Sequence, residues 1–175
     1  MNKRIRKKKE RQRNKALCER YPFLIPRNRW TDRIVWDSKD NWTYCTPYTY
    51  TELESFPKGW FKAFGHEMLE EIRDDCIKND FLYDMRIVEI KEKYGGLRFY
   101  IGSIPMDSKL FEIINKYEEM SYEYCMLCGR PAETSNEGYW VETLCPDCKR
   151  RMKEREKAAL KRLIVASGRN YENKR

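Results

Sequence analysis

The chain has 175 residues, of which 41% are apolar and 14% aromatic, and it carries a formal net charge of +8. The length fits one compact domain with or without a small appendage, and the apolar content excludes a fully disordered chain. No apolar run approaches the roughly 20 residues of a membrane span, and the charged N-terminus lacks the apolar segment of a secretory signal. Seven cysteines, an odd number, argue against a secreted disulfide framework. We therefore expect a cytoplasmic protein with no membrane partner.

The charge is concentrated at the two ends. Residues 1–20 hold ten Lys and Arg against two Glu, and residues 149–175 hold eleven against three Glu. Residues 21–148 are acidic, with 15 Lys and Arg against 23 Asp and Glu. Basic ends attract phosphate backbones or acidic protein surfaces, although Lys- and Arg-rich ends are also often plain solvated helices or tails. An acidic body with basic arms suits a protein that engages a nucleoprotein.

The N-terminal third combines a basic helix with an aromatic-rich stretch. Residues 2–20 have a helix-forming composition with few apolar residues, which predicts an exposed helix. Residues 21–61 hold eleven aromatic residues, and Pro22 and Pro26 favour extended backbone, so we expect irregular or short-strand structure around the core. Aromatic residues in such a segment form a core and a protein interface or, as the alternative, a stacking platform for bases. The candidate partner-binding residues are Trp30, Trp36 and Trp42.

A helix and a hairpin follow. Apolar residues that recur along one helical face predict a helix over about residues 57–78, with Cys76 as a core residue. The segment MRIVEIKEKYGGLRFYIG predicts a β-hairpin with strands at about 85–92 and 97–101 and a turn around Gly95-Gly96. The face of the helix consists of Phe61, Phe64, Met68, Ile72 and Cys76.

Two further helices are expected after the hairpin. Asp107 can cap the first of them, which carries an apolar stripe along one side. The second is strongly basic, begins after Cys148 and should end near Gly168. The stripe of the first helix consists of Leu110, Ile113, Ile114, Tyr117 and Met120.

Four cysteines form two pairs with the spacing C-x2-C-x16-C-x2-C: Cys125 with Cys128, and Cys145 with Cys148. This spacing is typical of a tetrahedral four-thiolate zinc site. Gly129 supplies the unstrained positive φ that such a turn often needs. A redox dithiol switch would use the same pairs, but nothing resembles a thioredoxin-like context. Four thiolates leave no open coordination position, so we expect one structural zinc ion.

These elements predict an α+β fold: a helix–β-hairpin–helix core with a C-terminal four-cysteine zinc ribbon and basic terminal helices. The expected organisation has four parts. They are a basic N-terminal arm (1–20), an α+β core with an aromatic-rich N-terminal segment (21–124), the zinc ribbon (125–148), and a basic C-terminal helix and tail (149–175).

Catalytic chemistry has little support in the sequence. His66 is the only histidine, and its neighbours on a helix would be charged, which indicates a solvated residue. No phosphate-cradling Gly-Lys-Ser/Thr loop occurs, and no small-molecule substrate is evident. The alternative is a Mg²⁺-dependent nuclease that uses Asp84, Glu89 and Lys91, although Asp84 and Glu89 would share one strand and no carboxylate on a second strand is evident. We therefore expect a non-enzymatic protein.

The two basic ends are the candidate nucleic-acid-binding segments, since their side chains could contact phosphates on both sides of a duplex or a guide-RNA complex. Such binding should depend weakly on base sequence, because no reading helix is recognisable. The candidate residues are Lys3, Arg4, Arg6, Lys7, Lys8, Lys9, Arg11 and Arg13 at one end and Lys149, Arg150, Arg151, Lys153 and Arg155 at the other.

Three motifs, RYPFLIPRNRWT (Arg20–Thr31), IKEKYGGLRFY (Ile90–Tyr100) and CMLCG…GYW…LCPDC, occur in this order over about residues 20–148. They resemble a widespread group of small proteins that are encoded in bacterial genomes, prophages and phages and mostly have no assigned function. The resemblance implies a phage accessory or anti-defence role in the cytosol of a bacterial host. One target that it suggests is a Cas9–guide RNA complex, which would make the protein an anti-CRISPR. The resemblance does not extend to the basic ends.

Overall fold

The computed structural model describes residues 2–37, 45–136 and 140–172, with side chains up to Val165. It is a mixed helix and strand structure, consistent with the expected α+β class. Its main elements are α1 (Lys3–Arg20), α2 (Lys58–Trp60), α3 (His66–Lys78), β1 (Arg86–Lys93), β2 (Gly96–Gly102), α4 (Leu110–Met120), β3 (Glu133–Ser135), β4 (Glu142–Leu144) and α5 (Pro146–Glu172).

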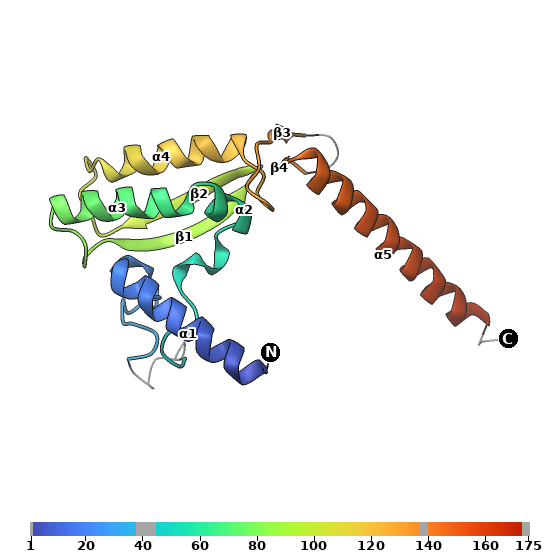
Figure 1. Ribbon diagram of the computed structural model, residues 1–175, viewed down its shortest axis with the longest axis horizontal. Helices are drawn as coiled ribbons and strands as arrows, with labels where there is room; N and C mark the ends of the chain where they lie inside the picture. Colours follow the sequence, from blue (N-terminus) through green and yellow to red (C-terminus); the bar gives the residue numbers. More distant parts are fainter. Residues whose placement is uncertain (1, 38–44, 137–139, 173–175) are drawn as a thin grey trace.

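The centre of the molecule is the antiparallel hairpin of β1 and β2, and α3 and α4 cover one of its faces (Figure 1). Ile90 lies opposite Phe99 in the register, and both side chains are buried in the core. The turn residues Tyr94 and Gly95 have φ of 52° and 75°, the pattern of a type I′ turn, which matches the twist of the strands. The predicted hairpin is confirmed, and each strand end differs from the prediction by one residue.

The outer edge of β2 is blocked by polar side chains from the segment that follows it. The Leu97 amide donates to Ser121 Oγ at 2.8 Å, and the Phe99 amide donates to Glu118 Oε1 at 2.7 Å. These bonds satisfy backbone donors that would otherwise be free to pair with another strand.

The helix predicted over residues 57–78 is present but contains a π-turn, Phe61–Gly65, between α2 and α3. Trp60 is fully buried at the start of this helix, and its Nε1 donates to the Tyr124 carbonyl at 2.7 Å. The Phe64 ring stacks on the Tyr117 ring of α4 with centroids 5.7 Å apart. Of the predicted apolar face, Phe61 is half-buried, and the buried members are Phe64, Met68, Ile72 and Cys76.

Two predicted helix ends are wrong. Asp107 does not cap α4; the helix begins at Leu110, and it is Ser108 Oγ that accepts the Leu110 amide at 3.3 Å. The last helix does not end near Gly168, because α5 continues to Glu172. A glycine in a helix lowers its stability by roughly 1 kcal/mol relative to alanine. This difference alone does not end a helix whose backbone can continue in the helical conformation.

The exposed N-terminal helix is confirmed as α1, which touches the body along one narrow side. Cys18 is buried there, and buried Asn14 donates from Nδ2 to the Tyr48 carbonyl at 3.1 Å. At the end of the helix, Arg20 Nε donates to Glu70 Oε1 at 2.6 Å, and the Tyr21 hydroxyl donates to the same oxygen. These bonds fix α1 against α3.

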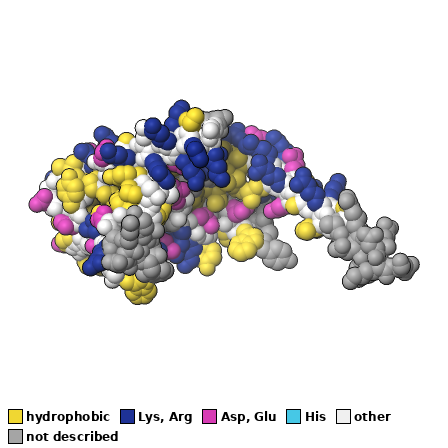
Figure 2. Space-filling model, turned by 90° about the horizontal axis from the view of Figure 1, so that it is seen from below, with side chains coloured by type: hydrophobic (Ala, Val, Ile, Leu, Met, Phe, Trp, Pro, Cys, Tyr) yellow, Lys and Arg dark blue, Asp and Glu magenta, His cyan; other side chains and the backbone are white. Residues whose placement is uncertain are grey.

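The last helix, α5, begins beside β4 and projects away from the body (Figure 1). Lys and Arg side chains run along it where it leaves the body (Figure 2). None of the helices in the described part of the chain is long and apolar enough to cross a membrane.

Candidate metal centre and basic surfaces

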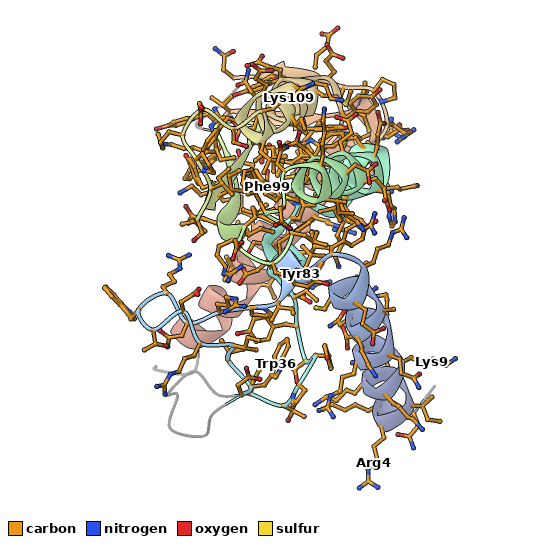
Figure 3. The ribbon with its side chains drawn as sticks, turned by 90° about the vertical axis from the view of Figure 1, so that its left-hand side faces the viewer. Arg4, Lys9, Trp36, Tyr83, Phe99 and Lys109 are labelled. Atoms are coloured by element: carbon orange, nitrogen blue, oxygen red, sulfur yellow. The ribbon has the colours of Figure 1, made fainter. Side chains whose placement is uncertain are left out.

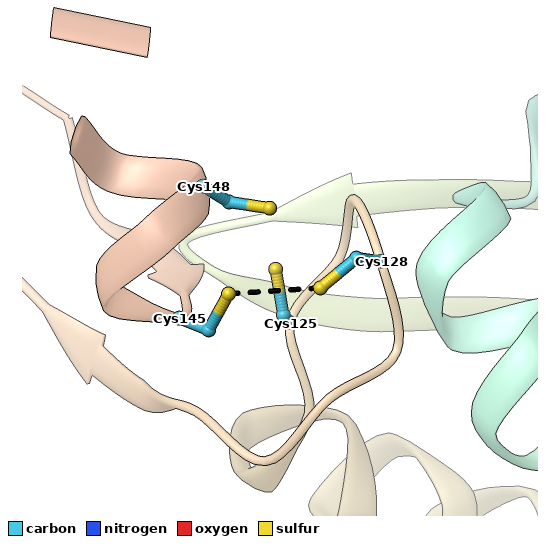
Figure 4. Close-up of side chains that lie close together, drawn as sticks. All are labelled: Cys125, Cys128, Cys145 and Cys148. Atoms are coloured by element: carbon cyan, nitrogen blue, oxygen red, sulfur yellow. Dashed lines mark hydrogen bonds between the residues drawn. The ribbon is translucent and has the colours of Figure 1, made fainter. Parts of the chain in front are cut away.

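The four predicted cysteine ligands lie together. One ligand atom from each of Cys125, Cys128, Cys145 and Cys148 lies within 4.8 Å of the others, and the sulfurs of Cys128 and Cys145 are 3.6 Å apart (Figure 4). Zinc–sulfur bonds of roughly 2.3 Å in a tetrahedron place the sulfurs about 3.8 Å apart. The donor set is therefore compatible with one zinc ion.

The first cysteine pair lies on a tight turn. Gly129 has φ of +78°, as predicted, and its amide donates to the Cys125 carbonyl at 2.9 Å. The turn packs on the body at Gly59, whose amide donates to the Met126 carbonyl at 2.9 Å. A Cβ on Gly59 would overlap the Cys125 carbonyl oxygen and lie 2.7 Å from the Cys128 nitrogen. The close approach therefore requires glycine at this position.

The second pair lies at the start of α5. Cys145 precedes Pro146, the first residue of the helix, and Cys148 lies in its first turn. The amino end of a helix carries a partial positive charge, which favours thiolates there. Within residues 125–148, β3 pairs with β4, and Thr143 Oγ1 donates to the Gly95 carbonyl at 2.6 Å. The segment is thus fixed to the body both at α2 and at the turn of the central hairpin.

Three charged side chains surround the sulfurs. Arg130 donates from Nε to Cys128 Sγ at 3.5 Å and from Nη2 to Cys145 Sγ at 3.3 Å. Its Nη1 donates to Asp147 Oδ2 at 2.9 Å. Arg151 Nη2 donates to Cys148 Sγ at 3.3 Å. These guanidinium groups would offset the negative charge that four thiolates and one divalent cation leave on the centre.

The thiols affect one another's ionisation. Burial disfavours the Cys128 thiolate, but hydrogen bonds from Arg130 outweigh it and lower the pKa of Cys128 to about 6. Burial, followed by hydrogen bonds with the other three sulfurs, raises the pKa of Cys148 to about 12. Four close thiols cannot all ionise unaided, whereas a divalent cation stabilises all four thiolates at once. The residues present therefore fit a bound zinc ion.

The predicted nucleic-acid-binding residues of α1 are exposed, and Arg4 and Lys9 point away from the body (Figure 3). Five basic side chains on one side of the helix line a hollow of about 420 Å³, together with Pro47 and Tyr48. We call this surface the α1 hollow. Its basic residues are Arg4, Lys7, Lys8, Arg11 and Lys15, of which the sequence prediction omitted Lys15, although the helical spacing of the five residues could have indicated it.

The predicted residues of α5 fall into two groups. Arg150 donates to Asp147 Oδ1 at 2.8 Å, Arg151 binds Cys148, and Lys149 donates to Ser135 Oγ at 3.1 Å. Lys149 thus joins the helix to β3, whereas the bonds of Arg150 and Arg151 lie within the first turns of α5 itself. Lys153 and Arg155 are exposed, as are three further basic residues that the prediction omitted: Lys157, Lys161 and Arg162.

The three candidate tryptophans have different environments. Trp30 is 85% exposed, whereas Trp36 is half-buried with its ring centroid 5.1 Å from that of Tyr48. Trp42 lies outside the described residues.

The alternative nuclease residues do not form a carboxylate pair on one strand. Asp84 lies in the turn before β1, and Glu89 and Lys91 lie on β1 in an ion pair of 2.6 Å. The hydrogen bond from Lys91 holds the pKa of Glu89 below its usual range. In the described part of the chain, the four cysteines are the one group of three or more Cys, His, Asp and Glu side chains close enough to share a metal ion.

Comparison with known proteins finds no matching family model, no matching curated protein and no matching solved structure.

Proposed function

We propose that this chain is a non-enzymatic zinc protein that binds nucleic acid or a nucleoprotein through its basic terminal helices. The observation that carries the proposal is the α1 hollow, where five cations on one helical face meet Tyr48. An array of this kind can follow a phosphate backbone. The helix is exposed, so its charged side chains remain in solvent and no desolvation free energy is lost on folding.

Zinc has a structural role in this proposal. Cys125, Cys128, Cys145 and Cys148 hold the ion, and four thiolates leave no coordination position for a substrate. When bound, the ion joins the two cysteine turns, so residues 125–148 form a zinc ribbon. Arg130 and Arg151 stabilise the thiolates, and the ribbon fixes the direction in which α5 leaves the body.

The exposed basic residues of α5 form the second contact surface. Lys153 and Arg155 are exposed and lie beyond Lys149, Arg150 and Arg151, whose side chains are engaged at the start of the helix, so their charges remain available to phosphates. α1 is fixed to the core by Arg20 and Tyr21, and α5 is fixed by the zinc ribbon. The two helices therefore present positive charge at defined places on the molecule.

The proposal is tested by metal analysis and by fluorescence anisotropy with labelled DNA and RNA at two salt concentrations. We expect one zinc ion per chain and salt-dependent binding. The triple variant Lys7→Gln, Lys8→Gln, Arg11→Gln should weaken binding and reduce the salt slope by about one per lost phosphate contact. The matched control, Lys62→Gln, Lys78→Gln, Lys109→Gln, removes the same charge from exposed sites elsewhere and should bind like the wild type. Binding that is absent or independent of salt would contradict the proposal.

The target that we propose on the basis of the phage resemblance is a Cas9–guide RNA complex, with an anti-defence role. An acidic body with basic helices suits a target that presents both protein and nucleic acid. Loss of Cas9 cleavage on addition of the protein would support this target, and unchanged cleavage would remove it. Mg²⁺-dependent cleavage of nucleic acid by the protein itself, lost in Glu89→Ala, would instead favour the nuclease alternative.

A further inference from the structure

The central hairpin has a second face, which α3 and α4 do not cover (Figure 1). Strand alternation places Ile90 and Phe99 in the core and their neighbours Lys91 and Tyr100 on the opposite side. Tyr100 is 43% exposed and Val88 is 49% exposed. We call this surface the outer hairpin face; it consists of Val88, Glu89, Lys91, Arg98 and Tyr100.

Cations lie beside the aromatic rings of this face. The Lys91 ammonium is 5.5 Å from the centre of the Tyr100 ring, and the Arg98 guanidinium is 5.9 Å from the centre of the Tyr122 ring. Arg98 also donates from Nη2 to the Tyr122 hydroxyl at 2.9 Å. Aromatic rings and basic groups therefore alternate over the sheet surface.

A short loop presents Trp30 next to this face. Asn28 Oδ1 accepts hydrogen bonds from the amides of Trp30 and Thr31, at 2.9 and 3.1 Å, and Arg27 pairs with Ile34 in an isolated bridge. The loop is joined to the hairpin by Arg29, which donates from Nη2 to the Val88 carbonyl at 3.3 Å. These hydrogen bonds hold the loop, and therefore Trp30, in a defined place. The Trp30 ring is 85% exposed, so its burial contributes little to the stability of the fold.

Basic side chains line the junction of loop and sheet. A pocket of about 260 Å³ is lined there by Arg27, Arg29 and Arg86, together with Asp32 and Glu52. Arg27 and Arg86 both form ion pairs with Asp32. Arg29 instead donates a hydrogen bond to the backbone carbonyl of Val88. Among the described residues Arg29 makes no ion pair within 4.0 Å, although its charge favours the ionised forms of Glu52 and Glu89 nearby. A phosphate near Arg29 would therefore compete with these more distant carboxylates and not with a direct ion pair.

The composition of this surface distinguishes between classes of partner. The centre of a protein interface is depleted in Lys and Glu, yet Lys91 and Glu89 lie in the middle of the outer hairpin face. Aromatic rings interleaved with Arg and Lys are instead typical of surfaces that bind single strands, whose unpaired bases stack on the rings. A duplex keeps its bases stacked inside, where Trp30 and Tyr100 could not reach them.

We propose that the outer hairpin face and the Trp30 loop form a binding surface for single-stranded nucleic acid, with bases stacked on Trp30 and Tyr100 and phosphates held by Arg29, Lys91 and Arg98. Phosphates at Lys91 and Arg98 would share these cations with the carboxylates of Glu89 and Glu118, which lie 2.6 and 3.9 Å away. The loop and β2 lie on the side of the molecule away from α1 (Figure 3). The inference rests on the proposed function for the class of partner, but it uses a surface separate from the α1 hollow. A strand on this face and a duplex on α1 could be bound at the same time.

The test is fluorescence anisotropy of the full chain with a labelled 20-nucleotide single strand and with a duplex of the same length. The double variant Trp30→Ala, Tyr100→Ala should weaken single-strand binding by roughly tenfold or more, since each base lost from a ring reduces affinity about that much. Duplex binding should change less than about twofold, because duplex contacts are to phosphates. The single variant Trp30→Phe keeps an aromatic ring at this position and should retain most of the wild-type affinity for the single strand.

Trp140→Ala is the matched control, because Trp140 is 80% exposed but lies in residues 125–148, the cysteine segment. It should bind both probes like the wild type. Single-strand binding that is unchanged in the double variant but lost in the α1 triple variant would overturn this inference and leave the proposed function intact. A wild-type protein that binds neither probe, even at low salt, would contradict both. A double variant that loses a protein partner while keeping the single strand would identify the face as a protein interface and overturn the inference.

Discussion

Arg130 connects the two halves of the metal centre. Its guanidinium contacts one sulfur from each cysteine pair and is held in place by Asp147. A planar group with several donors in a fixed arrangement can make these three contacts at once, which a lysine cannot. Arg130 is therefore a positioning residue for the proposed zinc ligands.

Replacing Arg130 by Gln should lower zinc affinity about 10- to 100-fold, because groups that hydrogen-bond metal ligands typically contribute that much. The measurement is competition for zinc with a coloured chelator. Arg155→Gln removes an equal charge from an exposed position on α5 and should retain zinc like the wild type. Equal affinities in the two variants would show that Arg130 does not support the centre.

Glu70 makes the stability of the α1 attachment depend on pH. Hydrogen bonds from Arg20 and then from Tyr21 hold the pKa of the Glu70 carboxyl below its usual range. The ionised form is thus favoured in the folded state, so its stabilising effect is complete above the unfolded pKa of about 4.3 and is lost as the pH falls through the lower folded value.

Glu70→Gln should therefore melt at a lower temperature than the wild type at pH 7, and the gap should close as the pH falls below about 4. Thermal unfolding followed by circular dichroism between about pH 7 and pH 3.5 measures it. Glu119→Gln, on the exposed side of α4, serves as the control and should follow the wild type. A gap that is constant with pH would show that ionisation of Glu70 does not contribute.

At the scale of elements, the cysteine segment and the core meet at Gly59 of α2. The backbone of residues 125–128 crosses so close to this position that an added Cβ would lie 2.5 Å from the Met126 carbonyl carbon. The neighbours are backbone atoms of the metal-binding turn, so neither side can yield easily.

Gly59→Ala should destabilise the fold by about 1–3 kcal/mol or more through overpacking, and it should also weaken zinc binding because the turn must move. Denaturant unfolding and the zinc competition assay measure the two effects. In Gly102→Ala the new Cβ would meet Val88 Cγ2 at 3.4 Å, an ordinary contact, so this variant should be close to the wild type. A loss of stability without a change in zinc affinity would mean that the turn and α2 are not coupled.

Local patterns predict the elements of this fold, because helical and strand periodicity depend on neighbours in the sequence. The buried stripe of α3, the hairpin turn and the cysteine spacing are all of this kind. The π-turn at Phe61–Gly65 is not predicted, because a face repeating every three to four residues does not reveal one extra residue in a turn. The N-cap of α4 is Lys109, two residues after the predicted Asp107, an offset that a pattern of capping residues cannot resolve.

Contacts between elements are not visible in the sequence. The role of Arg130, for example, depends on how two turns meet. Arg150 and Arg151, by contrast, bind Asp147 and Cys148 three residues earlier on the same helix, a spacing that the sequence could have indicated. The α1 hollow needs Pro47 and Tyr48 beside the helix, and only the tertiary structure places them there.

At the scale of the whole molecule, the apolar interior is divided into two parts. A large cluster joins α3, α4 and the central hairpin, and a small one surrounds Cys125, Cys145, Cys148 and Leu144. The large cluster contains aromatic side chains from the helices and the hairpin and includes none of the four proposed zinc ligands, whereas the small one consists mostly of those ligands. The core can thus remain folded when the small cluster comes apart.

Removing zinc should therefore release α5 while leaving the core folded. Without the cation the four thiols no longer hold the two turns together, and so little apolar surface remains around them that it cannot replace the metal. Hydrogen exchange after treatment with a chelator should show lost protection over residues 125–148 and retained protection in α3, β1 and β2. Nucleic-acid affinity should fall, because α5 loses its fixed direction, but should not vanish, because the α1 hollow is intact. Zinc should restore both properties and magnesium neither; loss of protection throughout the chain would instead make the metal essential to the entire fold.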